Sequence, residues 1–533
     1  MKEKRKDCFF LRIGTLISNL VLATLAATAF RAMRNHWVFY DPNTFFLGGS
    51  TGIFIIALVT IAVSLCLLVL RLYKPELKGK ELQDYKFLRI LGVIAFVLSL
   101  LLAVGICVII LCSDAEFFLM FLDVLKGDLP LVIIFAVVAI FLLALPKLRP
   151  KAKAIVAVCM AAIMGLWALW MVFPLKPYSF ASDPVVMDTG EEYAVVFATN
   201  DKGTGYVQYS FGGKDYTVYA EQQGRRISNR IIHSIRVPYE HLKNNAYSVG
   251  STQVFGDYAY GSRLGKSIEA GPYTLKVNEG ETQRYLCISD WHSQIKKAKG
   301  AIAQLGEYDG VIMLGDPNTG LNIEEQAVRY IVQFGGDITG GAMPVIYVRG
   351  NHETRGAFAA DLPEYLGFES FYYTVARGAY SFVVLDSGED KPDDHVEYGG
   401  LDEYARHRAD MLEWLQTKPQ TTDKLIVLSH DWLVSKPEPE VSRVAWDTLQ
   451  QMGARFMVSG HKHVCEFLED DTEDEAAPTY LKAYPGISTY IDGGYANQKF
   501  VASKLTVTAQ GVRFEAADNT GEKVMDKTLP WQQ

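Results

Sequence analysis

Residues 285–292 read Tyr-Leu-Cys-Ile-Ser-Asp-Trp-His, an apolar run that ends directly in side chains able to bind a metal ion. Four later segments repeat this arrangement: VIMLGDPN at 311–318, VIYVRGNHE at 345–353, LIVLSHD at 425–431 and FMVSGHKH at 456–463. Such short apolar runs predict buried strands, and the stretches 295–305, 324–334 and 404–415 between them are predicted to be helices. Strands that alternate with helices indicate an α/β domain in which the polar strand ends gather at the carboxyl edge of a sheet.

The residue types at these strand ends suit a pair of divalent cations. Such a pair uses carboxylate, imidazole and amide oxygen donors, and five of the ten histidines of the chain lie in the five segments. Two cations about 3.5–4 Å apart can bind both the nucleophilic oxygen and a phosphoryl oxygen of an in-line displacement. Gly315, Gly350 and Gly460 allow the backbone to approach an ion or a phosphate closely.

The motifs DWH, GDPN, GNHE, SHD and GHKH together resemble those of the calcineurin-like metallophosphoesterase superfamily, over about residues 282–500. The resemblance implies an α/β domain at residues 282–533, built as a double β-sheet sandwich flanked by helices. It also implies an enzyme with a dinuclear metal centre, which hydrolyses phosphoric esters by attack of a metal-bound hydroxide.

Carried over motif by motif, the resemblance assigns seven metal ligands and one catalytic acid. The first metal would be held by Asp290, His292 and His463, the second by Asn351, His430 and His461, and Asp316 would bridge them. His352 would protonate the leaving oxygen, and Glu353 would orient a ligand.

The sequence departs from one branch of the superfamily. Purple acid phosphatases have a Tyr three residues after the bridging Asp and lack the His of the first motif, whereas this chain has Thr319 and His292. An iron(III)–tyrosinate centre is therefore not expected, and the predicted cofactors are two divalent metal ions, Mn, Zn or Fe. Arg355 is open between two roles, binding the substrate phosphate or pairing with Asp361 or another carboxylate. The motifs do not separate phosphomonoesters from phosphodiesters.

Residues 183–278 precede this domain and are predicted to form a β-sandwich, because short strands alternate with turn residues over this range. The predicted strands are 193–197, 205–211, 216–220, 231–237 and 273–277. The position directly before the catalytic domain resembles that of the fibronectin type III-like domain in purple acid phosphatases. His233 and His241 are interpreted as structural residues.

The first third of the chain, residues 1–177, is predicted to be an all-α membrane domain. Five apolar stretches contain no charged residues and have about the length of a bilayer crossing, which takes ~20 residues: 13–30, 45–70, 90–112, 129–145 and 154–173. With a cytoplasmic N-terminus, 15 Lys and Arg lie on the inside against 4 on the outside, as the positive-inside rule requires. The protein is thus predicted to be multi-pass in the cell membrane, with an extracytoplasmic catalytic domain. A cleaved signal peptide ending at residues 27–29 is the alternative for the first stretch.

The net charge of the chain and its predicted membrane topology limit the expected partners and functions. Of the 52 Lys and Arg and 60 Asp and Glu, residues 1–173 hold 18 and 10, so the remaining chain has a net charge of −16. This acidic part argues against a nucleic acid as a structural partner, and leaves a phosphoester substrate and the lipid bilayer as expected partners. The predicted function is a membrane-anchored, metal-dependent phosphoesterase acting on phosphomonoesters or phosphodiesters outside the cytoplasm. The alternative is a membrane receptor or sensor whose ectodomain binds a phosphorylated ligand without turnover.

Overall fold

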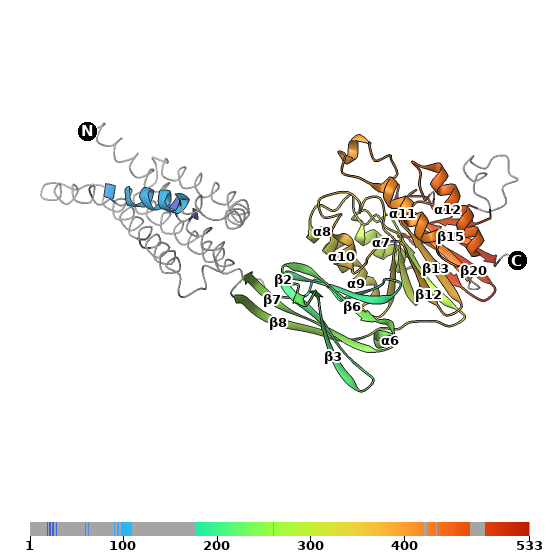
Figure 1. The fold of residues 1–533 in the computed structure, drawn as a ribbon, viewed down its shortest axis with the longest axis horizontal. Helices are drawn as coiled ribbons and strands as arrows, with labels where there is room; N and C mark the ends of the chain where they lie inside the picture. The colour runs from blue at the N-terminus through green and yellow to red at the C-terminus, as the bar shows by residue number, and fades with distance from the viewer. Residues whose placement is uncertain are drawn as a thin grey trace. The chain divides into compact units, whose positions relative to one another are not determined.

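The computed structural model describes residues 177–258, 261–419, 424–432, 434–468 and 486–531, together with helical residues 19, 21–22, 24–25, 28, 59, 62, 90, 93–94 and 97–108. The chain divides into two compact units (Figure 1). One comprises residues 1–177 and 255–264, and the other comprises residues 178–254 and 265–533. All five segments with candidate metal ligands, at 285–292, 311–318, 345–353, 425–431 and 456–463, belong to the second unit.

The predicted fold class is wrong in its first part, the all-α transmembrane bundle. No helix in the described part of the chain is long and apolar enough to cross a membrane. Most of the predicted spans at 13–30, 45–70, 90–112, 129–145 and 154–173 lies outside the described residues.

A sheet of 13 strands organises the second unit. Its main path runs β21-β20-β19-β9-β10-β11-β1-β2-β7-β8, with β18 beside β19 and with β3 and β6 beside β2. Strands β9, β10, β11 and β1 are parallel neighbours, as predicted for strands joined by helices. The strands are β1 (Val185–Asp188), β2 (Glu192–Phe211), β3 (Lys214–Tyr219), β6 (Arg230–Pro238), β7 (Ala246–Tyr258), β8 (Gly261–Thr274), β9 (Gln283–Ile288), β10 (Gly310–Met313), β11 (Pro344–Tyr347), β18 (Gly494–Ala496), β19 (Lys499–Val507), β20 (Gly511–Asp518) and β21 (Lys523–Pro530).

A second sheet of six strands runs in the order β12-β13-β14-β15-β17-β16, with β13, β14, β15 and β17 parallel. Its strands are β12 (Tyr373–Arg377), β13 (Tyr380–Leu385), β14 (Lys424–Ser429), β15 (Phe456–Ser459), β16 (Glu466–Leu468) and β17 (Ser488–Ile491). A small pair, β4 (Glu221–Gln222) and β5 (Arg225–Arg226), stands apart from both sheets.

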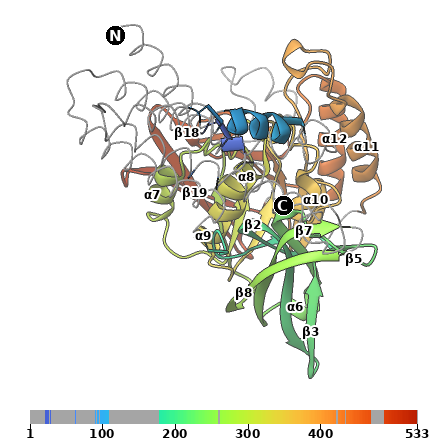
Figure 2. The same cartoon turned by 90° about the vertical axis from the view of Figure 1, so that its left-hand side faces the viewer.

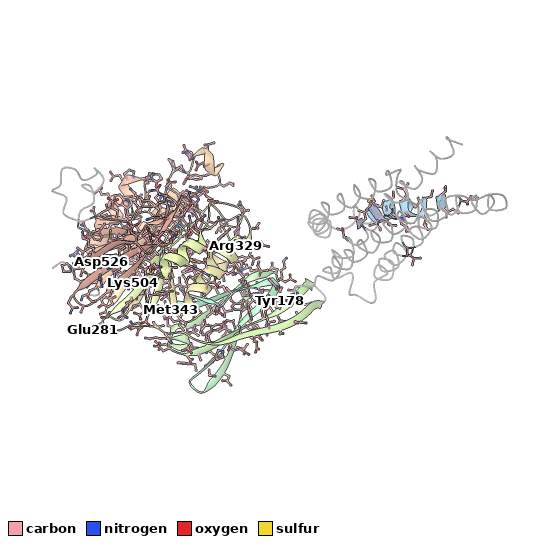
Figure 3. The ribbon with its side chains drawn as sticks, turned by 180° about the vertical axis from the view of Figure 1, so that it is seen from behind. Tyr178, Glu281, Arg329, Met343, Lys504 and Asp526 are labelled. Carbon is pink, nitrogen blue, oxygen red and sulfur yellow. The ribbon has the colours of Figure 1, made fainter. Side chains whose placement is uncertain are left out.

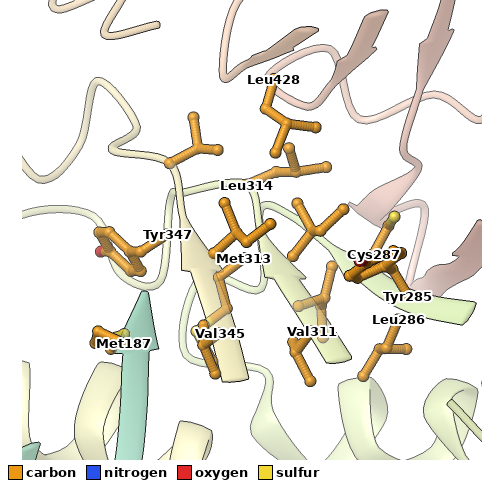
Figure 4. Packing of buried hydrophobic residues seen from close by; sticks show 14 of the residues in the cluster. Met187, Tyr285, Leu286, Cys287, Val311, Met313, Leu314, Val345, Tyr347 and Leu428 are labelled. Carbon is orange, nitrogen blue, oxygen red and sulfur yellow. The ribbon is translucent and has the colours of Figure 1, made fainter. Parts of the chain in front are cut away.

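The two large sheets face each other across one hydrophobic core, so the predicted double β-sheet sandwich is confirmed. Alternate residues of a strand point to opposite faces. In β14, Leu428 therefore belongs to the core between the sheets, whereas Val427 packs in a separate cluster with α11 and α12. Figure 4 shows Leu428 approaching Leu314, which follows β10, within this shared core.

Helices flank the sandwich. The predicted helices at 295–305, 324–334 and 404–415 correspond to α7, to the α8–η2–α9 segment and to α11. Helices α7 and α9 pack on strands of the first sheet, while α11 and α12 pack against each other beside the second (Figure 1). The helices are α6 (Tyr239–Leu242), α7 (Ile295–Ile302), α8 (Glu324–Ala327), the π-helix η2 (Val328–Val332), α9 (Gln333–Thr339), α10 (Leu362–Leu366), the 3₁₀-helix η3 (Val396–Tyr398), α11 (Tyr404–Gln416) and α12 (Pro439–Met452).

The predicted fibronectin type III-like domain at 183–278 is not confirmed, because its strands join the first sheet. Val186 of β1 lies beside Pro344 of β11, in parallel register, and β1 pairs on its other side with β2. The side chains of β1 are buried throughout, so this strand covers an edge of β11 that would otherwise be open. Strands β3, β7 and β8 lie together, away from α11 and α12 (Figures 1 and 2).

The C-terminal strands complete the other end of the first sheet. Strand β19 pairs antiparallel with β9, and β20 and β21 follow it as an antiparallel ladder. Figure 3 shows Lys504 of β19 and Asp526 of β21 on these strands, seen from behind. The central strands β9, β10 and β11 therefore have neighbours on both sides, and their carboxyl ends carry the candidate site.

Candidate metal centre

The five motif segments leave the carboxyl ends of five strands in the two facing sheets. Segments 290–292, 316–318 and 351–353 follow β9, β10 and β11 of the first sheet, and segments 430–431 and 461–463 follow β14 and β15 of the second. Strands within each set are parallel, so their carboxyl ends lie at a common edge. The structure thus brings together six of the seven residues predicted to be metal ligands in three groups of donor atoms, and the seventh, Asn351, contacts His430 and His461.

The backbone of the site is unusually constrained. Five of the predicted ligands adopt left-handed backbone angles, which cost non-glycine residues of order 1–3 kcal/mol. They are Asp290, His292, Asp316, His461 and His463, with φ of 50°, 34°, 58°, 71° and 54°. Such strain persists where the surrounding structure holds it, and it is concentrated here on residues that carry donor atoms.

Glycines next to these residues permit the close packing of the loops. A Cβ atom on Gly350 would lie 2.2 Å from Asp316 Oδ1, and a Cβ on Gly315 would lie 2.4 Å from the Gly350 nitrogen. A Cβ on Gly460 would lie 2.7 Å from the Cβ of Ser289. The sequence predicted that these three glycines let the backbone approach an ion or a phosphate, and that stays a prediction. What the structure shows is close approach between loops of the site itself.

One group of donors consists of Asp290, His292 and His463, whose ligand atoms lie within 4.8 Å of one another. The Nε2 atoms of the two histidines are 3.3 Å apart, and His463 Nε2 is 3.5 Å from Asp290 Oδ1. The His463 Nδ1–H donates to the Tyr495 carbonyl at 2.7 Å, so Nε2 carries a lone pair. Asp290 Oδ1 is buried without a hydrogen-bond partner in the described part of the chain. The unpartnered Asp290 oxygen and the Nε2 lone pair of His463 fit a bound cation.

A second group consists of Asp316, His430 and His461, joined by the side chain of Asn351. His430 Nε2 lies 3.3 Å from Asp316 Oδ2 and 3.2 Å from Asn351 Oδ1. His461 Nδ1 lies 3.2 Å from the same amide oxygen. Asp316 Oδ2 is also 3.8 Å from His292 Nε2. This carboxylate therefore connects the two groups, as expected of a bridging ligand.

Electrostatics in the second group favour positive charge. Burial alone would raise the pKa of the Asp316 carboxyl, but the imidazoles of His430, His352 and His292 outweigh burial and hold it below its usual range. Burial opposes protonation of His430, yet the Asp316 carboxylate raises the pKa of this imidazole well above its ordinary value. A proton on His430 and a divalent cation would be stabilised by the same neighbours.

Glu353 supports this arrangement from behind, as predicted. Its carboxylate accepts the backbone N–H groups of Asp316 and Gly350, both at 3.0 Å, and the Tyr347 hydroxyl at 2.9 Å. Burial, and then the Asp316 carboxylate, raise the pKa of Glu353 to about 8. Glu353 thus fixes the two turns that follow β10 and β11 without contacting the donor atoms.

His352, the predicted acid, lies at the edge of the cluster and is partly exposed. Its Nδ1 is 3.1 Å from the Thr319 carbonyl, and its Nε2 is 3.8 Å from Asp316 Oδ2. The backbone N–H of His352 donates to Asp316 Oδ1 at 3.0 Å. His352 also forms a third donor group with His292 and Asp316, so its position suits either a proton donor or a cation ligand.

Arg355 takes the second of its two predicted roles. Its guanidinium forms a bidentate pair with the buried carboxylate of Glu389, at 2.6 and 2.7 Å. Glu389 also accepts the hydroxyls of Thr354 and Tyr398. The partner is not Asp361, and Glu389 carries no sequence signal that could have identified it, because it lies in an irregular loop 34 residues away.

Several residues of the site were not predicted from the sequence. The Tyr495 carbonyl holds His463, and the preceding Gly494 lies so close to Asp290 that a Cβ would be 2.6 Å from its side chain. Asp492 accepts Ser289 Oγ at 3.0 Å, directly beside the first motif. The run Asp-Gly-Gly-Tyr at 492–495, directly after a strand, resembles the pattern of the five motifs and was the available signal.

Among the described residues, His233, His241 and the two cysteines of the polar part of the chain do not belong to the three donor groups. His233 is buried and contacts the hydroxyls of Thr199 and Ser251, in agreement with a structural role. His241 stacks on Phe211. Cys287 and Cys465 are both free thiols.

Residues 283–465 match the family model described as calcineurin-like phosphoesterase. No curated protein matches the chain. Solved structures that match include a predicted phosphoesterase from Streptococcus pneumoniae TIGR4 (12% identity, 47% of this chain, 98% of that chain, TM-score 0.22) and a metallophosphoesterase from Sphaerobacter thermophilus (18%, 46%, 89%, 0.23). Vps29 of Entamoeba histolytica with Zn²⁺ also matches (11%, 47%, 99%, 0.22). The family match covers all five motif segments, and residues 283–465 therefore form a calcineurin-like metallophosphoesterase domain.

Proposed function

We propose that the chain hydrolyses phosphomonoesters or phosphodiesters with the help of two divalent cations, Mn, Zn or Fe. The observation that carries this proposal is the meeting of seven carboxylate, imidazole and amide donors from five strand ends. Asp290, His292 and His463 would hold one cation and Asn351, His430 and His461 the other, with Asp316 shared. Bound there, the cations would acidify a water molecule and withdraw charge from a phosphoryl oxygen.

The residues around the donors would supply orientation and a proton. The Nδ1–H of His352 is directed at the Thr319 carbonyl, so Nε2 is the atom that would hold the proton for the leaving oxygen. The guanidinium of Arg355 is paired with Glu389. Arg355 would therefore shape the wall of the substrate site and would not leave Glu389 to bind the phosphate.

A direct test uses the full chain, depleted of metal with a chelator and reloaded with Mn²⁺. We expect hydrolysis of p-nitrophenyl phosphate or bis(p-nitrophenyl) phosphate to depend on added Mn²⁺. Asp316→Asn should lower kcat by more than about 100-fold, because it removes the donor shared by both groups. Asp526→Asn, a carboxylate paired with Arg513 on the C-terminal strands, is the matched control.

Two results would contradict the proposal. If the metal-loaded protein turns over neither ester, or if Asp316→Asn and wild type have the same rate, the cluster is not a phosphoesterase centre. The ratio of the two wild-type rates would assign the enzyme to monoesters or diesters.

We also propose the cellular location predicted from the sequence, at the cell membrane with the catalytic domain outside the cytoplasm. Its support comes from the sequence alone: the segments that separate the five charge-free stretches fall into two alternating sets, one with 15 Lys and Arg and the other with 4. Protease added to intact cells should then digest the domain at residues 282–533. Protection of this domain until the cells are lysed would contradict the proposal.

A further inference from the structure

His461 differs from three other histidines of the centre in how its second ring nitrogen is held. His430, His463 and His352 each direct Nδ1 at a backbone carbonyl, those of Leu314, Tyr495 and Thr319. In His461 it is Nδ1 that faces the donor cluster, 3.2 Å from Asn351 Oδ1. Its Nε2 therefore points away from the cluster, and the group that approaches it is a carboxylate, Asp431 Oδ2 at 3.7 Å.

The backbone of Asp431 is fixed by two hydrogen bonds. Its carbonyl accepts Ser429 Oγ at 2.7 Å, and its N–H donates to Ser387 Oγ at 3.3 Å. The next residue, Trp432, is buried in the cluster beneath α11 and α12. The Asp431 side chain is 8% exposed and lines the same small cavity as His461, His430 and Asn351. A carboxylate fixed so close to a ligand histidine can influence which ring nitrogen carries the proton.

We propose that Asp431 is the positioning residue of His461, and that it selects the tautomer with a proton on Nε2 and a lone pair on Nδ1. This inference rests on the proposed function, because His461 matters as a cation ligand. Asp431 Oδ2 lies 3.7 Å from His461 Nε2, at ion-pair distance and beyond a direct hydrogen bond, so the carboxylate acts on this nitrogen through its charge or through a bridging water molecule. A carboxylate beside the second N–H of a ligand histidine orients the ring and makes the ligand more basic. The residue acts through His461 and touches neither substrate nor reacting atoms.

A second carboxylate in the cavity provides a matched control. Asp390 lines the same cavity, but its oxygens face Lys391 Nζ at 3.4 Å and Lys436 Nζ at 3.5 Å. Removing either carboxylate takes one negative charge from the wall of the centre. Only removal of Asp431 also takes away the carboxylate that lies 3.7 Å from His461 Nε2.

The experiment measures binding of Mn²⁺ alone to the full, metal-depleted chain by isothermal titration calorimetry, without substrate. We expect Asp431→Ala to weaken one of two Mn²⁺ sites by about 10–100-fold and to leave the other close to wild type. Asp431→Asn keeps an acceptor oxygen and should lose less than Asp431→Ala. Asp390→Ala should lose less Mn²⁺ affinity than Asp431→Ala. Its loss should come only from the removal of one negative charge, which both substitutions share.

Three results would overturn the inference. These are a wild-type affinity in Asp431→Ala, an equal loss in Asp390→Ala, or a loss of both sites together in Asp431→Asn. Should Asp431→Ala unfold, Asp431→Asn against Asp390→Asn gives the same comparison. Failure of the proposed function is a different result, namely normal Mn²⁺ binding with no ester hydrolysis.

Discussion

A carboxylate oxygen of the centre has no hydrogen-bond partner among the described residues. Asp290 Oδ1 is buried without a hydrogen bond in the described part of the chain, and the facing Nε2 atoms of His292 and His463 are 3.3 Å apart. An unsatisfied buried acceptor costs about 1–3 kcal/mol, more when it is charged. At the scale of the residue, the centre thus gives up stability that a bound cation can restore.

Metal removal should therefore lower stability. At a free Mn²⁺ concentration 100 times its Kd, a single site stabilises the folded chain by about 2.7 kcal/mol. We expect a chelator to lower Tm and added Mn²⁺ to restore it, as measured by differential scanning fluorimetry. Asp316→Asn should show a smaller Mn²⁺-induced shift. A Tm that does not respond to Mn²⁺ would contradict a cation site at these residues.

Replacement of His352 by Asn separates its two possible roles. As an acid, His352 should contribute about 10²–10⁴-fold to kcat. The loss should be larger for alkyl phosphates than for p-nitrophenyl phosphate, because p-nitrophenolate leaves readily without a proton. Mn²⁺ affinity should be unchanged. An affinity that falls together with kcat would identify His352 as a cation ligand.

A buried ion pair behind the site should make stability depend on pH. Burial alone would raise the pKa of Asp386, but the guanidinium of Arg349 at 2.6 Å, together with His407 at 2.9 Å, holds it below the usual range. A carboxyl with a depressed folded-state pKa stabilises the fold at a pH above its unfolded pKa of about 4, and this contribution is lost as pH falls further.

We expect Asp386→Asn to lower the free energy of unfolding by about 3–5 kcal/mol at pH 7, since it leaves Arg349 buried without its partner. The difference from wild type should shrink as the pH falls below about 4. Urea denaturation across this range measures it. In a double-mutant cycle, Arg349→Met combined with Asp386→Asn should cost less than the sum of the single changes. A pH-independent difference would contradict this account.

At the scale of the element, the strand ends work because their turns can touch. The loops after β10 and β11 are joined through Glu353, which accepts N–H groups from both, and Gly350 leaves room for Asp316. Carboxylates, imidazoles and glycines therefore form one packed unit rather than five independent turns.

Gly350→Ala tests this packing. The new Cβ would lie 2.2 Å from Asp316 Oδ1 and 2.5 Å from the Asp316 nitrogen, so one of the two turns must shift. We expect a destabilisation of about 1–3 kcal/mol, typical of overpacking, together with loss of ester hydrolysis. Gly300→Ala in α7 is the control, because its Cβ would be 3.3 Å from the nearest atom. Unchanged activity in Gly350→Ala would show that the turns move independently.

At the scale of the whole molecule, the segment before the catalytic domain is part of its fold. Strand β1 pairs with β11, and Val185, Met187 and Ala194 belong to the core shared by both large sheets. A buried ion pair between Asp188 and Arg377 links β1 to β12 of the second sheet. The second unit should accordingly unfold as one cooperative structure.

Truncation tests this continuity. A fragment that starts at residue 279 exposes the edge of β11 and leaves Arg377 buried without its carboxylate, which alone costs about 3–5 kcal/mol. We expect this fragment to aggregate or to lack a cooperative thermal transition by circular dichroism. The fragment 178–533 should retain a single transition. A stably folded, active 279–533 fragment would contradict this expectation.

Much of the catalytic fold could be predicted from the sequence because its signals are local. An apolar run followed by Asp, His or Gly-Asn-His is visible over fewer than ten residues, and parallel strands bring their carboxyl ends to one edge. The pattern therefore determined the five strands, the helices between them and the seven donors that the structure brings together. The same local reading was wrong for the transmembrane bundle.

The contacts between distant segments could not be predicted from the sequence and follow from the tertiary structure. Four contacts join segments that are far apart in the chain. They are the pairing of β1 with β11, the ion pair of Arg355 with Glu389, the hydrogen bond of His463 to the Tyr495 carbonyl and the approach of Asp431 to His461. A local pattern states which side chains can donate, accept or carry charge. Which of them meet depends on the path of the whole chain, because burial and sheet order select one partner among many equivalent ones.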